Sequence, residues 1–205
     1  SWDETFQMLR KLIAQEFRRH DELASSAALS DYEKIEYSLL ATNKADDISY
    51  QMSLQTLTFL LHKHHNVAPI VIIDEYDTPI QQGHMNGFYD AVIGFMRNLF
   101  SGGLKDNAHL SYGFLTGILR VAKESIFSGL NNLKINSILD ERYSEYFGFT
   151  PDEVRKMAEY YQASDKYSEL SSWYDGYRFG NTEIFNPWSV IGYFNNHCRP
   201  KAFWQ

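Results

Sequence analysis

The segment VIIDEYDTPI, residues 71–80, decides how the rest of the chain is interpreted. It joins an apolar, β-branched run to three acids, Asp74, Glu75 and Asp77. A short continuous apolar run is typical of a strand buried on both faces, as in a parallel sheet. Ligands of such sheets bind beyond the carboxyl ends of the strands. The segment therefore predicts a buried strand that delivers carboxylates to a ligand-binding edge.

Helical patterns and a second strand surround this segment. Apolar residues at helical spacing predict four helices, over 3–20, 30–42, 46–65 and 86–101. The last of these is expected to end at Ser101-Gly102-Gly103. HLSYGFLTG, residues 109–117, predicts a second strand, parallel to the first because a helix separates them. A short helix over 124–133 and a third strand over 134–139 are expected to follow.

The chain becomes helical and aromatic after residue 148. We expect helices over 150–162 and 186–196, each with a capping residue and a proline at its start. Between them, WYDGYRFG and NTEIF predict turns or a short hairpin. The organisation expected from the sequence is an α/β core over 1–148 and a helical, aromatic-rich subdomain over 149–205.

Composition limits the classes of function. The 205 residues are 44% hydrophobic and carry a net charge of -7, which argues against a general phosphate-neutralising surface. The one cysteine, Cys198, excludes an intramolecular disulfide and fits a reducing, cytoplasmic location. No apolar run approaches the ~18 residues of a membrane span, so we expect no membrane partner.

The acids at the strand end suit phosphate chemistry. Successive side chains of a strand point to opposite faces, so Asp74 and Glu75 can serve different partners. In P-loop NTPases an acid here helps hold Mg²⁺, and another residue can orient the attacking water. Thr116, at the end of the second strand, could sense a γ-phosphate, and Arg120 could neutralise phosphate charge. The plainer alternatives are a polar strand end, an ordinary turn and a solvated arginine.

The motifs and their order resemble a known family. VIIDEYDTPI is followed by GFLTGILRVAKESIFSGLNNL, YFGFT with DEV, WYDGYRFG and FNPWSVIGYF. Together, over roughly residues 67–205, they are similar to the bacterial AAA-ATPase-like family, whereas residues 1–66 share only helical character. The resemblance implies a partial P-loop NTPase-like parallel sheet flanked by helices, followed by a smaller helical lid. In this family a PD-(D/E)XK nuclease-like domain often follows downstream.

The resemblance also implies roles for single residues. Asp74 would be the Walker B acid that holds Mg²⁺, Glu75 the catalytic acid, and Asp77 a supporting, cofactor-binding residue. Thr116 would contact the nucleotide at the sensor position, and Arg120 would act in catalysis. Four residues of the family's blocks receive no role from the sequence: Asn131, Asn132, Asp175 and Arg178.

The chain departs from the family in one respect. It contains no G-x-x-x-x-G-K-[S/T] motif, and Gly102-Gly103-Leu104-Lys105 stands between a helix and a strand, the reverse of the required context. A chain without a P-loop lacks the backbone amides and the lysine that bind the nucleotide phosphates in these proteins. Either the chain starts after the P-loop of a longer protein, which its abrupt first and last residues favour, or the protein lacks one. We expect ATP and Mg²⁺ to be used by a complete parent, through an upstream P-loop, and not by this chain alone.

Other function classes stay open. A degenerate ATPase-like scaffold could bind a protein or a nucleic acid without hydrolysis, and this alternative gains if the protein begins near Ser1. A metal-dependent nuclease would need an acid two residues before a lysine on a strand, and the acids considered, at 31–34 and 152–153, lie on predicted helices. The aromatic cluster at 171–179 could stack bases beside Arg178, but the acidic net charge favours a packing role.

Overall fold

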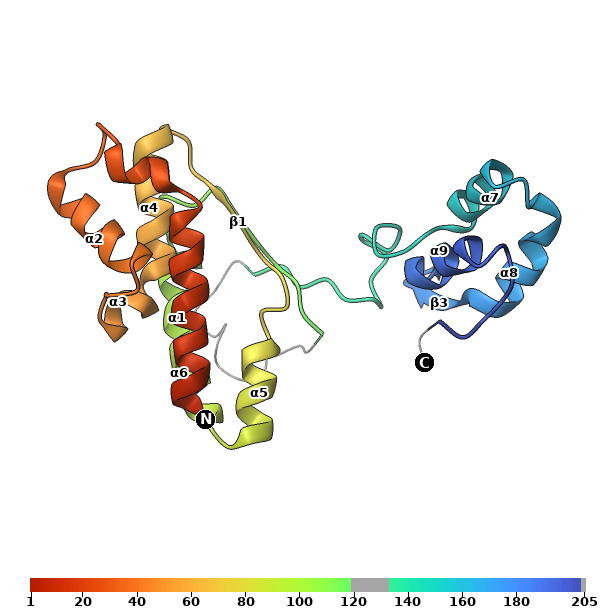
Figure 1. The fold of residues 1–205 in the computed structure, drawn as a ribbon, viewed down its shortest axis with the longest axis horizontal. Coiled ribbons are helices and arrows are strands. Elements are labelled where there is room, and N and C mark those ends of the chain that lie inside the picture. Colours follow the sequence, from red (N-terminus) through yellow and green to blue (C-terminus); the bar gives the residue numbers. More distant parts are fainter. Residues whose placement is uncertain (119–132, 204–205) are drawn as a thin grey trace. The chain divides into compact units, whose positions relative to one another are not determined.

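The computed structural model describes residues 1–118 and 133–203. Two compact units make up the chain, a first unit of Ser1–Leu133 and a second unit of Lys134–Gln205 (Figure 1). This division lies nearer the N-terminus than the boundary near 148 expected from the sequence. The helix expected over 124–133 falls, except for its last residue, outside the described residues.

The first unit begins with helices whose ends the sequence encodes. Helix α1 spans Trp2–Arg18, a short 3-10 turn follows at Asp21–Ser25, and α2 spans Asp31–Ala41. Ser30 caps α2: its hydroxyl accepts the Glu33 amide at 3.3 Å, and the Glu33 carboxylate accepts the Ser30 amide at 2.6 Å. Such reciprocal capping satisfies amides that the first helical turn leaves without partners.

The single helix expected over 46–65 is two helices. Helix α3 spans Asp47–Gln51 and α4 spans Ser53–His65, with Met52 between them. The Ser53 hydroxyl donates to the Tyr50 carbonyl at 2.8 Å, a local bond that competes with continuous helix. Helix α4 ends at Asn66, which adopts the left-handed conformation with φ of 54°.

Two helices lie between the strands of the first unit, where the sequence predicted one. Helix α5 spans Thr78–Asn86 and ends at Gly87, and α6 spans Tyr89–Leu104. The expected stop of α6 at Ser101-Gly102-Gly103 is wrong, because the helix continues through both glycines. A Cβ at Gly103 would lie 2.8 Å from Leu54 Cβ, so this glycine allows α6 to approach α4 closely.

The strands pair as predicted but are covered on one face only. Strands β1 (Ile70–Ile73) and β2 (Tyr112–Leu115) are parallel, with Ile73 opposite Leu115. Ile73 and Leu115 pack on the helices, whereas Ile70 and Ile72 are 63% and 72% exposed. Burial of this strand on both faces is therefore a wrong prediction: in the described residues, helices cover one side of the pair.

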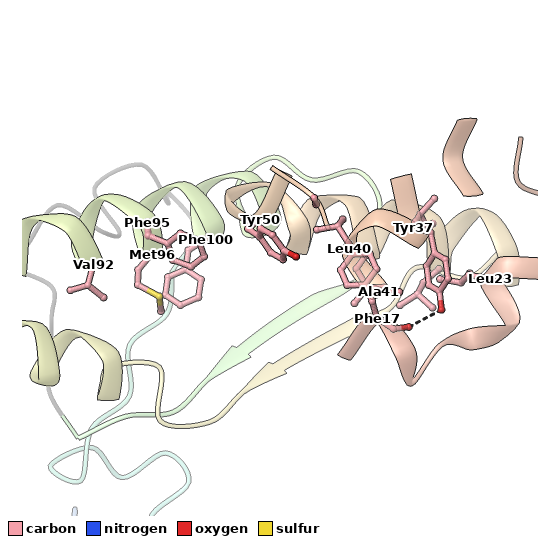
Figure 2. Packing of buried hydrophobic residues seen from close by; sticks show 14 of the residues in the cluster. Phe17, Leu23, Tyr37, Leu40, Ala41, Tyr50, Val92, Phe95, Met96 and Phe100 are labelled. Carbon is pink, nitrogen blue, oxygen red and sulfur yellow. Dashed lines mark hydrogen bonds between the residues drawn. The ribbon is translucent and has the colours of Figure 1, made fainter. Parts of the chain in front are cut away.

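The core of the first unit forms where the helices meet. In Figure 1 α6 lies largely behind α1, and the ring of Phe6 on α1 lies 5.4 Å from that of Phe95 on α6. Helix α6 also packs on α4. Figure 2 shows the buried residues at closer range, including the Tyr37 hydroxyl that donates to the Phe17 carbonyl at 3.1 Å. Each fully buried large apolar side chain stabilises the unit by about 1.5–3 kcal/mol.

The second unit combines helices with a hairpin. Its elements are α7 (Pro151–Tyr160), a 3-10 turn (Ser164–Lys166), α8 (Tyr167–Tyr174), β3 (Asp175–Phe179), β4 (Thr182–Phe185) and α9 (Pro187–Asn195). Strands β3 and β4 are antiparallel, which confirms the hairpin alternative. The strand expected over 134–139 is absent from this described segment. There the Ser137 amide donates to the Asp140 carboxylate at 2.6 Å, which favours a turn.

Helix length bears on membrane insertion. Among the described residues, no helix is both long and apolar enough to cross a bilayer.

Candidate functional site

Polar side chains from the two parallel strands meet where the strands end. Asp74 follows β1 and Thr116 follows β2, and the Thr116 hydroxyl donates to Asp74 Oδ1. Backbone bonds extend the pairing beyond the strands: Thr116 N–H donates to the Ile73 carbonyl at 2.9 Å, and Tyr76 N–H donates to the Thr116 carbonyl at 3.0 Å. The structure therefore fixes Thr116 against the acids, at the edge where the sequence placed it.

Glu75 adopts an uncommon backbone conformation. Its φ is 51°, in the left-handed region that costs a residue other than glycine about 1–2 kcal/mol. Its amide donates to Asp74 Oδ1 at 3.0 Å and to Thr116 Oγ1 at 3.4 Å, and these bonds hold the turn. The Glu75 side chain is exposed. Strained backbone of this kind is often found at binding and catalytic sites.

Asp77 is turned into the protein. It is 1% exposed, and its Oδ2 accepts the Gln81 side-chain amide at 2.9 Å and the Ile118 backbone amide at 3.2 Å. The carboxylate therefore links the first turn of α5 to the segment that follows Thr116. Contact of Asp77 with a cofactor stays a prediction, and this burial favours a positioning role instead.

The other residues singled out by the sequence lie elsewhere. Arg120, Asn131 and Asn132 fall outside the described residues. Asp175 and Arg178 belong to β3 of the second unit. The glycine pair at 102–103 lies in the last turn of α6, which confirms that this segment is not the loop between a strand and a helix that phosphate binding requires.

Comparison with known proteins places the chain in a family. The model of the AAA-ATPase-like family, described as a predicted AAA-ATPase, matches residues 1–127. This chain belongs to the AAA-ATPase-like family. The match includes residues 1–66, in which the sequence motifs indicated only helical character.

Known relatives add little to the family assignment. The chain is 34% identical over 137 residues to an uncharacterized protein in the vnfD 5' region of Azotobacter chroococcum mcd 1. The match covers 65% of this chain and 26% of that protein, so the chain spans about a quarter of its relative. No solved structure matches the chain.

The strand ends of this AAA-ATPase-like protein carry oxygen atoms of the kind that bind Mg²⁺. Mg²⁺ prefers oxygen ligands and is commonly held by one or two carboxylates, water and substrate phosphates. The Asp74 carboxylate and the Thr116 hydroxyl are oxygen ligands of this kind. No group of three or more His, Cys, Asp or Glu residues in the described part of the chain is arranged to hold a metal. The donor set therefore fits a magnesium ion whose remaining ligands come from water and a nucleotide.

Two residues that pack around these side chains, Gln81 and Tyr76, were not predicted. The side-chain amide of Gln81 donates to Asp77. Residues four apart are neighbours on a helix, so the spacing of Asp77 and Gln81 in the sequence could have predicted this contact. Tyr76 packs its ring 6.3 Å from the ring of Phe100, and it lies beside Gly117. A Cβ at Gly117 would lie 2.7 Å from both the Tyr76 ring and Asp77 Oδ1, so the turn after Thr116 depends on tight packing.

Proposed function

We propose that this chain is the core of a Mg²⁺-dependent ATPase domain. In this proposal Asp74 and Thr116 hold the metal, and Glu75 orients the water that attacks the γ-phosphate. The contact between the Thr116 hydroxyl and Asp74, at the carboxyl ends of parallel strands in an AAA-ATPase-like protein, carries the proposal. A cytoplasmic location belongs to the same proposal, since the single cysteine suits a reducing compartment.

The residues around the strand ends would divide the work. Bound Mg²⁺ would neutralise charge on the phosphate oxygens. Asp74 supplies the anionic ligand, and its bonds from Thr116 and from the Glu75 amide fix the direction of its carboxylate. The left-handed backbone conformation of Glu75 determines the direction in which its exposed side chain leaves the chain. Asp77 would hold the turn after Thr116 in place through the Ile118 amide.

The residues that would bind the nucleotide phosphates are expected to lie outside this chain, in a longer protein. The sequence contains no P-loop motif, so we propose that nucleotide binds through a P-loop upstream of Ser1 and that this chain alone does not turn over ATP. The relative, of which the chain covers 26%, has room for further domains. A nuclease-like domain downstream belongs to the same proposal, and so does a nucleic-acid or protein partner of the protein.

Calorimetry with Mg²⁺-ATP tests the proposal. The titration is made on this chain and on a longer protein, where the gene encodes residues upstream of Ser1, and turnover is measured in parallel. We expect binding and hydrolysis by the longer protein only. Asp74→Asn should abolish the Mg²⁺-dependent turnover, and Glu75→Gln should keep nucleotide binding but lose hydrolysis. Unchanged ATP hydrolysis in one of these variants would show that the substituted residue does not have the role proposed for it.

A second candidate function follows from the exposed face of the sheet. Ile70, Ile72 and Tyr112 are 63%, 72% and 56% exposed on neighbouring strands, and Phe114 is 39% exposed. Contiguous apolar surface of this kind often marks an interaction site. If the longer protein also fails to bind Mg²⁺-ATP, the chain is better explained as an interaction module on an ATPase-like scaffold that does not hydrolyse ATP.

A further inference from the structure

A pocket in the second unit is lined by none of the proposed ATPase residues. Its volume is about 370 Å³, and it lies where α8 ends and β3 begins. Asn186, which caps α9, and Ser189 in the first turn of α9 complete its lining. Trp173, Asp175, Gly176 and Tyr177 are among the residues that line it. Ligand pockets range from about 300 to 1,000 Å³, so this one suits a group the size of a single side chain.

Gly176 is the informative residue of the pocket. A Cβ at this position would meet no atom of the described chain within 4 Å, so packing does not require a glycine. Its φ lies outside the left-handed region, so the backbone does not require one either. Gly176 is the extra residue of the β-bulge between Asp175 and Tyr177. A glycine inside a strand weakens that strand and often marks a place where a ligand approaches the backbone.

The side chains around Gly176 favour a cationic ligand. Trp173 and Tyr177 are 48% and 53% exposed, which leaves their rings accessible. The Asp175 side chain is exposed and forms no salt bridge within the described residues. A guanidinium group stacks on aromatic rings and pairs with a carboxylate through two parallel hydrogen bonds, which an ammonium group cannot do.

We propose that this pocket binds the side chain of an arginine carried by a partner protein. A protein segment is favoured because β3 pairs with β4 alone in the described part of the chain, which leaves its other edge without a strand. An extended segment can pair with such an edge. The first residues of β3 belong to the lining of the pocket, so an arginine in a segment paired with β3 would lie near it. The proposal does not depend on ATP binding.

An NMR titration of the 205-residue chain tests this proposal. The probe is the acetylated, amidated peptide Gly-Arg-Gly, and the matched control replaces arginine by citrulline, which has the same shape without the charge. We expect the arginine peptide to shift the Gly176 amide and Trp173 indole signals with a Kd on the order of 1 mM. The citrulline peptide should bind at least about tenfold more weakly, since it cannot form the charged pair.

Variants separate the pocket from general charge effects. Gly176→Val should abolish binding while keeping the fold, because a β-branched residue suits a strand and the space for it is open. Asp175→Asn should weaken binding about tenfold, whereas Asp165→Asn, an exposed acid outside the pocket, should leave it unchanged. The proposal would be overturned if the citrulline peptide bound as tightly as the arginine peptide, or if both pocket variants kept full binding. It would also be overturned if a single-stranded oligonucleotide shifted these signals and the arginine peptide did not.

Discussion

Thr116 donates its hydroxyl hydrogen to Asp74 across the carboxyl ends of β1 and β2. Two helices separate these residues in the sequence, and the parallel pairing of the strands brings them together. The contact links the two residues proposed to hold the metal, Asp74 and Thr116, and the sequence also predicted that Thr116 senses a phosphate. A change in the position of either residue would therefore be transmitted to the other.

Removing the Thr116 hydroxyl tests whether this contact supports metal binding. Thr116→Val keeps the shape of the side chain but cannot donate to Asp74 or offer an oxygen ligand. We expect Mg²⁺-dependent turnover of a protein that includes the P-loop to fall by about 10- to 100-fold, the range typical of groups that support a metal ligand. Thr116→Ser should retain most of the activity. Equal turnover by the serine and valine variants would mean that the hydroxyl has no part in the reaction.

Glycine at position 75 should relieve the strained backbone. Glu75→Ala and Glu75→Gly both remove the carboxylate, but only glycine adopts a φ of 51° without a steric penalty. We expect the glycine variant to exceed the alanine variant by about 1 kcal/mol in free energy of unfolding, measured with urea. Equal stabilities would show that Glu75 stores no strain. ATP hydrolysis by the longer protein should be lost in both variants.

Local patterns predicted the parts of the fold that depend on local physics. The capping pair of Ser30 and Glu33 is present as expected, because such pairs lie within one helical turn. Asp74 and Glu75 follow β1 directly, as the apolar run before them predicted, but the left-handed backbone at Glu75 was not predicted. Burial of the strand on both faces was predicted wrongly, since the exposure of Ile72 depends on elements distant in the sequence. The burial of the Asp77 side chain was likewise not predictable from the residues next to it, because it involves a hydrogen bond from the Ile118 amide, far away in the sequence.

Glu33 should make the first unit pH-sensitive. The Lys63 ammonium lies 2.7 Å from Glu33 Oε1, and this bond, together with those from Ser30, holds the pKa of the Glu33 carboxyl below its usual value. A lowered folded-state pKa stabilises the protein above the unfolded-state pKa near 4.5, and this contribution is lost as the pH falls through the folded-state value. Because Lys63 is 39% exposed, we expect Glu33→Gln to cost only about 0.5–1 kcal/mol at pH 7.

Urea unfolding at pH 7 and at pH 3 measures this effect. The difference between the wild type and Glu33→Gln should shrink at pH 3, where the wild-type carboxyl gains a proton. Asp31→Asn removes a charge from the same helical turn without the lysine contact, so its cost should be smaller and less dependent on pH. A cost for Glu33→Gln that is equal at both pH values would show that the contact with Lys63 is not what stabilises the unit.

Two glycines of α6 should respond to alanine with opposite signs. A Cβ at Gly103 would lie 2.8 Å from Leu54 Cβ, so Gly103→Ala must push α6 away from α4, at a cost of about 1–3 kcal/mol. A Cβ at Gly94 meets nothing within 4 Å, so Gly94→Ala should gain up to about 1 kcal/mol from helix propensity. Urea unfolding measures both changes. Stabilisation by both alanines would contradict the close helix contact, and unchanged stability with lost nucleotide binding in Gly103→Ala would instead make the glycine pair a phosphate-binding element.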